Sequence, residues 1–187
     1  VQYITNNQEF MRLNFYVDEN VLIPQPDTEI LVEEVIKSID IKENIEILDM
    51  CTGSGCIGIS LAKNIENTKV TLVDISKEAI EIAKKNAIQN GVENKVTFIQ
   101  SDMFENVKGK FDIIVSNPPY IKTDIIQTLD KQVQNEPHIA LDGGEDGLDF
   151  YKILINEAHK YLKKDGKIFL EIGYDQKQEI ESLAKQS

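Results

Sequence analysis

Short runs of apolar, mostly β-branched residues recur along the chain, and each run ends at a polar residue. Strands inside a parallel sheet have this character because helices cover both of their faces. The pattern predicts five such strands, at Ile45–Asp49, Val70–Asp74, Val96–Asp102, Phe111–Asn117 and Lys167–Glu171.

The stretches between these strands carry apolar residues at helical spacing. The predicted helices include Cys56–Asn64, Ser76–Gln89 and Tyr151–Lys163. Ser76 can cap the second helix, and Asn90-Gly91 can end it. We expect Asp165-Gly166 to turn the third helix into the fifth strand, with Lys163 in the last helical turn. The alternation of strands and helices predicts an α/β fold with a doubly wound, mostly parallel sheet.

The segment before the first predicted strand has a different pattern. Met11–Val17 alternates between apolar and polar residues, and the apolar Val21–Ile23 follows the polar Asp18–Asn20. This arrangement predicts a small β-hairpin with its turn at Asp18–Asn20. Pro24–Pro26 then breaks the second hairpin strand, and a helix is expected from Asp27 to about Ser38.

Composition limits the class of protein. The 187 residues, 41% of them hydrophobic, fit one domain that can bury a core. A formal net charge of -12 would repel a phosphate backbone, which argues against direct nucleic-acid binding without excluding it. Cys51 and Cys56 match neither a redox pair nor a zinc half-site. With no apolar run long enough to span a membrane and no signal-peptide pattern, we predict a cytoplasmic protein that does not contact membranes.

A glycine-containing loop follows the first predicted strand. Gly53 and Gly55 allow a tight turn and a close approach of backbone amides to a ligand at a helix N-terminus. Glycine in such a turn can also serve conformation alone, so the loop by itself is weak evidence for a cofactor. The residues expected to contact the ligand are Thr52, Gly53, Ser54, Gly55 and Cys56.

Acids at the ends of the next two strands strengthen the case for a nucleoside ligand. Asp74 lies about 20 residues beyond the loop, a spacing at which a carboxylate can accept both ribose hydroxyls. A capping role for Asp74 is the weaker alternative, because Ser76 already fits that role. Asp102 could bind an adenine amine while Met103 packs on the ring, although a solvated acid and a core methionine would look the same. Because Gly53–Gly58 also fits the dinucleotide motif, NAD binding stays open.

Asn117-Pro118-Pro119-Tyr120 directly follows the fourth predicted strand. An amide nitrogen is a poor nucleophile because its lone pair is delocalised, so a catalyst must position it. The Asn117 side-chain oxygen and the Pro118 carbonyl could accept both amine hydrogens and aim the nitrogen at an electrophilic methyl. Pro118 and Pro119 fix the backbone, and Tyr120 can stack on a planar group. A merely stiff loop is the alternative, which the preceding loop and acid make weaker.

With these residues the chain resembles the HemK/PrmC family, the protein-(glutamine-N5) methyltransferases that modify class 1 peptide chain release factors. The resemblance covers nearly the whole chain. It rests on Val21–Glu29, Asp49–Gly55, Asp74, Ser101-Asp102, Asn117–Tyr120, Glu136-Pro137, Ala140-Leu141, Gly143-Gly144 and Asp146-Gly147-Leu148. The first and last of these segments are more specific to the family than the cofactor loop.

The resemblance implies a class I, Rossmann-like methyltransferase that uses S-adenosylmethionine. Residues 1–38 would form the hairpin and first helix, packed on a cofactor-binding domain at 39–187. Thr52 to Cys56, Asp74, Asp102, Met103 and Asn117 would hold the cofactor. Asn117–Tyr120 would hold the glutamine of a Gly-Gly-Gln tripeptide and yield N5-methylglutamine. The resemblance implies neither a metal nor a catalytic histidine, so His138 and His159 are expected to be ordinary surface or helix residues.

The chain departs from the family's pattern in several places. The family usually has Gly where Cys51 stands and Arg where Gln25 stands. Its helical N-terminal domain and its last strand pair have no counterpart here. We therefore expect the fifth strand to form an exposed sheet edge, which would lower stability or promote association.

Three other functions compete with glutamine methylation. An adenine N6-methyltransferase acting on nucleic acid could use the same Asn-Pro-Pro-Tyr group, but the acidic charge argues against it. A nicotinamide-dependent dehydrogenase would need a hydride-accepting site, which we cannot identify in the sequence. A non-catalytic nucleoside-binding module would bind the cofactor without methyl transfer to an amide.

Overall fold

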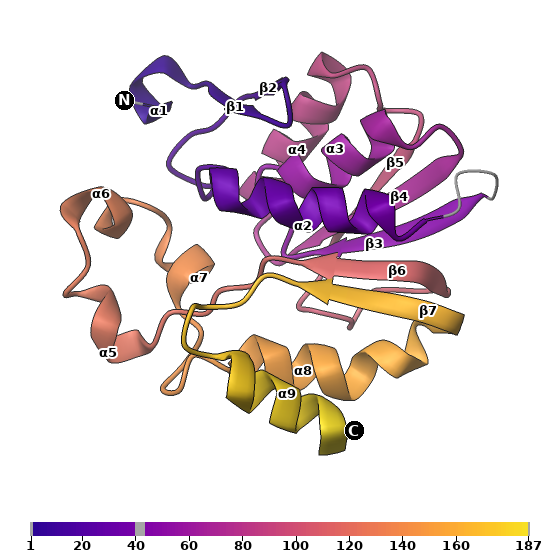
Figure 1. Cartoon of the computed structure of the whole chain (residues 1–187). Helices are drawn as coiled ribbons and strands as arrows, with labels where there is room; N and C mark the ends of the chain where they lie inside the picture. Colours follow the sequence, from indigo (N-terminus) through magenta and orange to yellow (C-terminus); the bar gives the residue numbers. More distant parts are fainter. Residues whose placement is uncertain (1, 40–43, 187) are drawn as a thin grey trace.

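The computed structural model describes residues 2–39 and 44–186 of the chain (Figure 1). Within these residues, five strands form one sheet in the order β5-β4-β3-β6-β7, and every neighbouring pair is parallel. The strands are β3 (Ile45–Met50), β4 (Thr68–Asp74), β5 (Val96–Gln100), β6 (Phe111–Ser116) and β7 (Leu162–Leu170). The five predicted strands and the α/β class are confirmed.

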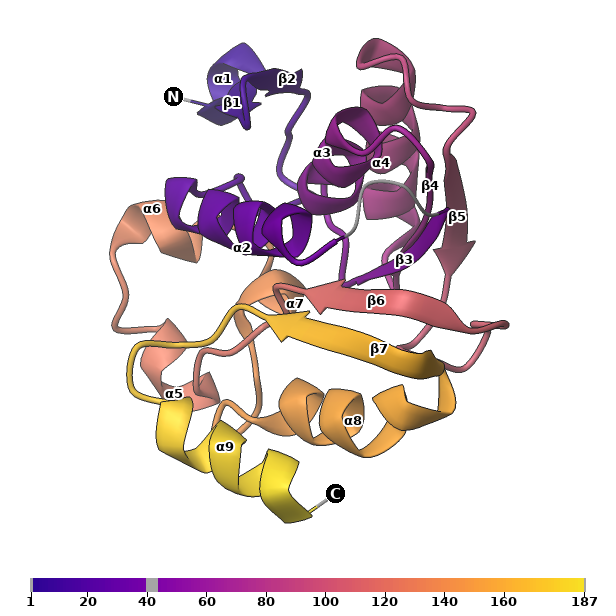
Figure 2. The ribbon, with the colours of Figure 1, turned by 45° about the vertical axis from the view of Figure 1, so that its right-hand side comes forward.

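Helices cover both faces of this sheet, as Figures 1 and 2 show. One face carries α2 (Pro26–Lys37), α3 (Cys56–Asn64) and α4 (Lys77–Gln89), and the other carries α8 (Asp149–Glu157) and α9 (Lys177–Gln186). Neighbouring residues of β3 belong to different cores: Ile47 packs in the cluster under α3, and Leu48 packs with Leu154 of α8. Burial on both faces explains why the strands read as nearly continuous apolar runs.

Three short helices lie in the long connection between β6 and α8. They are α5 (Thr123–Ile126), α6 (Lys131–Gln134) and α7 (His138–Leu141). Figure 1 shows them beyond the carboxyl ends of the strands, on the same side of the molecule as the loops that follow β3 and β6. A single-turn 3-10 helix, η1 (Ala158–Lys160), follows α8. The connection therefore adds a wall at the sheet edge where the predicted polar residues gather.

The boundaries of α3 and α4 agree with the prediction. The helix predicted at Cys56–Asn64 is α3, with the same ends. Ser76 caps α4, since its hydroxyl accepts a hydrogen bond from the Ala79 amide at 3.1 Å. Gly91 follows the helix with a positive φ of 67°, the conformation that glycine adopts without strain.

The N-terminal hairpin is present, but the predicted turn and second strand were wrong. After α1 (Gln2–Thr5), β1 (Gln8–Phe10) pairs antiparallel with β2 (Leu13–Phe15). The turn is Met11-Arg12, and both residues have positive φ (51° and 60°), which suits the twist of a two-residue hairpin. Val21–Ile23 forms no strand; Val21 is buried with Ala79 and Ile82 of α4. Neither Met11 nor Arg12 is a typical turn residue, so the sequence pattern did not indicate a turn at this place.

The helix predicted at Tyr151–Lys163 ends earlier than expected. It stops at Glu157 and passes through η1 to Tyr161, whose ring stacks on Phe104 with centroids 4.5 Å apart. Lys163 lies in β7, with Nζ 2.9 Å from carboxylates of Glu46 and Asp112. The placement of Asp165-Gly166 between helix and strand was also wrong.

Asp165-Gly166 lies inside β7, where the strand bulges. The register with β6 shifts between the pairs Phe111↔Leu162 and Ile113↔Lys167, and Asp165 has a positive φ of 65°. A bulge of this kind accommodates extra residues while the strand continues. Among the described residues β7 is one edge of the sheet, as expected; association through that edge stays a prediction.

One buried amide joins the hairpin to the sheet domain. Asn86 of α4 is 0% exposed, and its Oδ1 accepts a hydrogen bond from the Tyr16 amide at 2.7 Å. Its Nδ2 donates to the Tyr16 carbonyl at 3.0 Å and to the Ser54 carbonyl at 2.8 Å. The same side chain therefore holds both the segment after β2 and the glycine loop after β3.

We predict that Asn86→Leu lowers the free energy of unfolding by about 3 kcal/mol, because one buried and two partly buried backbone groups lose their partner. Urea unfolding followed by circular dichroism measures this. Asn64→Leu, an exposed position on α3, is the matched control and should change stability by less than about 1 kcal/mol. Equal losses from the two variants would contradict a special role for the buried amide.

Candidate active site

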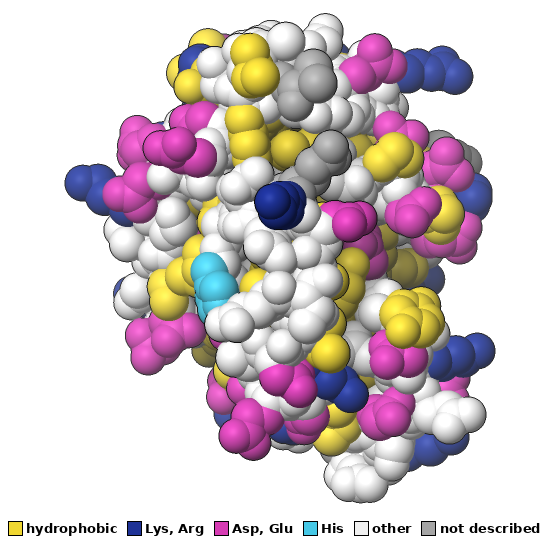
Figure 3. Space-filling view, turned by 90° about the vertical axis from the view of Figure 1, so that its left-hand side faces the viewer, with side chains coloured by type: hydrophobic (Ala, Val, Ile, Leu, Met, Phe, Trp, Pro, Cys, Tyr) yellow, Lys and Arg dark blue, Asp and Glu magenta, His cyan; other side chains and the backbone are white. Residues whose placement is uncertain are grey.

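A cavity of about 470 Å³ lies at the carboxyl edge of the sheet, where the loops after β3, β4, β5 and β6 meet. Its remaining walls come from the segment before α2 and from the connection that contains α7. The space-filling view of this end of the molecule shows hydrophobic side chains exposed among groups of acidic ones (Figure 3). Predicted site residues that line it are Thr52, Gly53, Ser54, Cys56, Asp74, Asp102, Met103, Asn117 and Pro119.

The loop after β3 presents its backbone to this cavity. Gly53 has a φ of 53°, and a Cβ added there would meet nothing within 4 Å, so the peptide is open to a ligand. Gly55 is not among the lining residues. It lies behind the wall, where an added Cβ would be 2.7 Å from Ile59 Cδ1. Gly53 therefore faces the cavity, and Gly55 allows α3 to pack closely.

Two backbone amides hold the Asp74 carboxylate in place, while the cap of α4 is Ser76. Its Oδ2 accepts a hydrogen bond from the Gly53 amide at 2.8 Å, and its Oδ1 accepts one from the Ser76 amide at 2.9 Å. Burial raises the pKa of this carboxyl. Because each carboxylate oxygen has a second lone pair, the fixed Asp74 can still accept two hydroxyl hydrogens.

Asp102 and Met103 lie together at the end of β5. Asp102 is exposed at the cavity, whereas Met103 is 6% exposed and has a positive φ of 43°. The Met103 sulfur is 3.9 Å from the Cys51 sulfur. Cys51 itself has a φ of 58°, a conformation that favours glycine, which explains physically why the resembling family usually has Gly at this position.

Asn117 places its amide between α2 and the cavity. The side-chain Nδ2 donates a hydrogen bond to the Thr28 hydroxyl at 3.3 Å, and the residue lines the cavity with Pro119. Pro118 and Tyr120 are not among the lining residues. The Tyr120 ring packs with the cluster of Leu148, Tyr151 and Ile180, and burial raises its pKa.

The backbone after Asn117 is held by glycines of the segment that precedes α8. A Cβ added at Gly143 would lie 2.8 Å from Tyr120 Cα and 2.9 Å from the Pro119 carbonyl oxygen. Only glycine permits this approach without a shift of the backbone. The buried Gln176 donates from Nε2 to the carbonyls of Tyr120 (3.0 Å) and Gly147 (3.1 Å). Contacts with Gly143 and Gln176 therefore restrain the Asn117–Tyr120 backbone from two sides.

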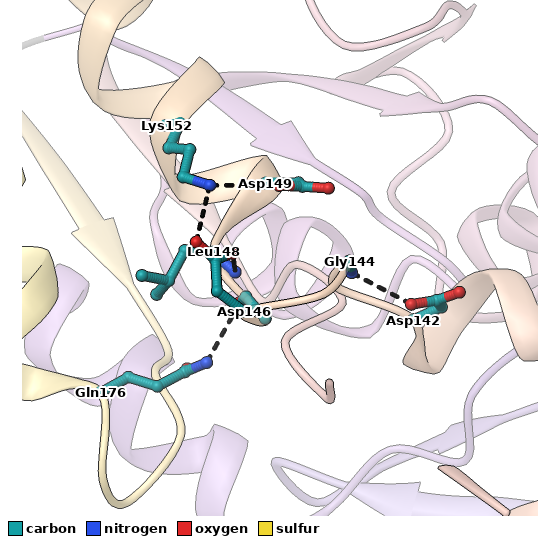
Figure 4. Close-up of polar contacts among 8 residues, drawn as sticks. Asp142, Gly144, Asp146, Leu148, Asp149, Lys152 and Gln176 are labelled. Carbon is teal, nitrogen blue, oxygen red and sulfur yellow. Dashed lines mark hydrogen bonds and ion pairs between the residues drawn. The ribbon is translucent and has the colours of Figure 1, made fainter. Parts of the chain in front are cut away.

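Figure 4 shows how carboxylates order the glycine-rich segment itself. Asp142 accepts a hydrogen bond from the Gly144 amide at 3.0 Å, and Asp146 accepts one from the Leu148 amide at 3.0 Å. Lys152 then joins Asp146 and Asp149 through contacts of 2.8 and 3.3 Å. The acids in this segment thus have a structural role in shaping one wall of the cavity.

Two family-specific segments meet at the opposite wall. Glu136 Oε2 accepts a hydrogen bond from the Ile23 amide at 3.1 Å, across 113 residues of sequence. Burial raises the pKa of Glu136. Gln25, where the resembling family usually has Arg, is exposed and lines the cavity, and its amide donates to the Ile23 carbonyl at 2.9 Å. The contact of Glu136 with Ile23 joins the segments that contribute Leu22, Pro24 and Ile139 to the cavity wall.

Sequence reasoning assigned no role to four residues that shape the site. They are Thr28, Glu136, Gln176 and Glu171, which lies beside Thr28 and Asn117. Thr28 and Glu136 stand in segments that carried the family resemblance, and Glu171 ends the fifth predicted strand as Asn117 ends the fourth. The partners of Thr28, Glu136 and Gln176 come from segments far away in sequence, so no local pattern marked their contacts.

Neither His138 nor His159 is among the residues that line the cavity. Among the described residues, no group of three or more His, Cys, Asp or Glu side chains could hold a metal ion. His138 is exposed on α7 with Nδ1 3.7 Å from Asp142, and His159 is exposed in η1.

Within the described residues, no helix is long and apolar enough to cross a membrane.

Known proteins with a similar sequence pattern or fold are methyltransferases. Residues 25–136 match the methyltransferase small domain family. The fold superimposes on the solved methyltransferase from Pyrococcus furiosus with a TM-score of 0.68 and 21% identity, over 93% of this chain and 77% of that one. Fold and cavity together define a class I S-adenosylmethionine-dependent methyltransferase domain.

Sequence relatives narrow the class to one family. The release factor glutamine methyltransferase of Clostridium acetobutylicum is 46% identical over 98% of this chain and 66% of its own length. That of Thermodesulfovibrio yellowstonii is 44% identical over 100% of this chain and 68% of its own length. The chain belongs to the release factor glutamine methyltransferase family and spans about two thirds of the length of these relatives.

One buried carboxyl beneath the glycine loop makes stability depend on pH. Asp49 is 0% exposed, and its Oδ2 accepts hydrogen bonds from the Thr52 hydroxyl (2.5 Å) and the Gly58 amide (2.9 Å). Its Oδ1 has no hydrogen-bond partner among the described residues. Burial raises the pKa of Asp49 from 3.8 to about 7. The folded state therefore binds this proton more tightly than the unfolded state.

We predict that the stabilisation from protonated Asp49 is complete below about pH 4 and is lost as the pH rises to about 7. Asp49→Asn cannot titrate, so its free energy of unfolding should fall less steeply over this interval than that of the parent protein. Urea unfolding at a series of pH values measures both slopes. Parallel curves for the two proteins would contradict the assignment.

Proposed function

We propose that the chain binds S-adenosylmethionine in the cavity and transfers its methyl group to the side-chain nitrogen (N5) of the glutamine in the Gly-Gly-Gln motif of class 1 release factors. The observation that carries the proposal is the placement of Asn117 beside the residues suited to a nucleoside. Its Nδ2 is turned toward Thr28 and Glu171, so its Oδ1 is left to accept a substrate N–H.

The cavity residues suit the cofactor. Asp74, fixed by two backbone amides, would accept the ribose hydroxyls, and the open backbone at Gly53 would approach the amino-acid portion. Met103 and the 46% exposed Ile75 would enclose the adenine, with Asp102 near its amine. The volume of about 470 Å³ is ordinary for a small-molecule site. When bound, the cofactor supplies an electrophilic methyl group.

The chain's own residues would act by orientation. Asn117 Oδ1 would accept one hydrogen of the substrate amide, and the carbonyl of the buried Pro118 would accept the other. These two acceptors fix the direction of the nitrogen, which a delocalised amide needs more than deprotonation. The clamps by Gly143 and Gln176 keep that backbone from moving away. Tyr120 packs with Leu148, Tyr151 and Ile180, and it would also border the substrate glutamine.

The charge of the cavity favours a protein substrate over nucleic acid. Among its lining residues, the charged side chains are Asp74, Asp102, Asp142 and Asp149, and none is Lys, Arg or His. With a net charge of -12, this environment repels phosphates. The names of the relatives point to the same substrate class. Since release factors act on the ribosome, we also infer a cytoplasmic location.

We predict that a release factor incubated with this protein and S-adenosylmethionine gains one methyl group on the glutamine of Gly-Gly-Gln. Tandem mass spectrometry of the tryptic peptide locates the modification. A release factor with Gln replaced by Glu at that position is the control and should gain nothing. Methyl incorporation into RNA or DNA instead would establish the adenine N6 alternative.

We predict that two substitutions separate binding from orientation. Asn117→Ala should lower kcat by about a hundredfold or more with a small change in the dissociation constant of the cofactor. Asp74→Ala should chiefly weaken cofactor binding, by about tenfold or more, because it removes the hydroxyl acceptor. Single-turnover kinetics and calorimetric titration measure these values. Unchanged turnover in the first variant, or unchanged affinity in the second, would remove that residue from its assigned role.

A further inference from the structure

Glu171 lies where β7 and β6 end side by side. The paired residues Ser116 and Leu170 are the last of their strands, and the Glu171 amide donates to the Ser116 carbonyl at 3.0 Å. Asn117 and Glu171 therefore leave the sheet at the same level. The side chains of Asn117 and of Thr28 on α2 lie close enough to the Glu171 carboxylate to lower its pKa.

Thr28 connects the two side chains. It is 2% exposed on α2, and its oxygen accepts the hydrogen bond from Asn117 Nδ2 at 3.3 Å. Its own hydroxyl hydrogen is then available to Glu171. Asn117 therefore donates to Thr28, and both side chains lie beside the Glu171 carboxylate, which can accept their remaining hydrogens.

This arrangement constrains the orientation of the Asn117 amide. A primary amide can exchange its oxygen and nitrogen by a half turn, and both orientations fill the same space. An ionised carboxylate only accepts hydrogen bonds, so it favours the orientation with the Asn117 nitrogen toward Glu171. The Asn117 oxygen then faces the cavity, where the proposed reaction needs an acceptor.

Packing stability does not explain a glutamate at this position. Burial raises the pKa of Glu171, and the neighbouring Asp27 raises it further. Its Oε2 is buried and has no hydrogen-bond partner among the described residues. A half-satisfied buried carboxylate costs stability, so its retention fits a role in the site.

We propose that Glu171, acting through Thr28, is a positioning residue that fixes the Asn117 amide with its oxygen toward the substrate nitrogen. This inference rests on the proposed amide methylation and extends it. Glu171 is not among the residues that line the cavity. Its effect passes through Thr28 to Asn117, which does line the cavity.

The test removes the acceptor and the relay separately. Glu171→Leu and Thr28→Val should each lower kcat for the release factor by about ten- to a hundredfold, while the cofactor dissociation constant and the substrate KM change less than about threefold. Thr28→Ser retains the hydroxyl and should recover most of the turnover. Glu171→Gln retains an oxygen but can also donate, so it should recover the turnover only in part. Glu179→Leu and Thr97→Val, at exposed positions, are the matched controls.

A second readout is independent of methyl transfer. In ¹⁵N NMR spectra, the Asn117 side-chain NH₂ hydrogens, assigned by their loss in Asn117→Asp, should exchange slowly with water in the parent protein and faster in Glu171→Leu. The parent protein could methylate no glutamine while the slow exchange of these hydrogens is still lost in Glu171→Leu. In that case the proposed function fails and the effect of Glu171 on the Asn117 amide stands. Full turnover in a folded Glu171→Leu, or unchanged exchange of these hydrogens, would overturn the inference.

Discussion

The pairing of β3 with β4 on one side and with β6 on the other is the constraint on which the rest of the structure depends. In this register Met50 lies opposite both Val73 and Ser116, so the three strands end at one level. The connections from β3 and β6 then leave toward opposite faces of the sheet, which opens a crevice between them. The glycine loop, Asp74 and Asn117 meet in that crevice although more than 60 residues separate the first from the last.

The segments that are most specific to the family act mainly as walls and clamps. The contact of Glu136 with Ile23 joins the connection after β6 to the segment before α2, and Gly143 allows a close approach to the Pro119-Tyr120 backbone. Few of these residues need to touch a reacting atom. In the proposed reaction they would hold the connection so that two acceptors, Asn117 Oδ1 and the Pro118 carbonyl, keep a fixed separation. Orientation of this kind is the main contribution a protein can make to a reaction of an unreactive amide.

The sequence was sufficient where the signal is local. Apolar runs, the Ser76 cap and polar residues at strand ends depend on nearby residues, and they predicted the sheet, α3 and α4. Most of the predicted site residues also line the cavity. It failed where distant partners decide the outcome. The Met11 amide in the hairpin turn donates to Glu29 of α2, and Tyr161, beyond the end of α8, stacks on Phe104. The role of Glu171 exists only once α2 lies against the ends of β6 and β7.

The central claim concerns which atoms of the chain meet the substrate nitrogen. A crystal structure of the protein with S-adenosylhomocysteine and a peptide containing Gly-Gly-Gln would test it most directly. The account predicts the glutamine side-chain nitrogen between Asn117 Oδ1 and the Pro118 carbonyl, with Asp74 on the ribose and Glu171 behind Asn117. A glutamine bound elsewhere, or an Asn117 amide with its nitrogen toward the substrate, would contradict it.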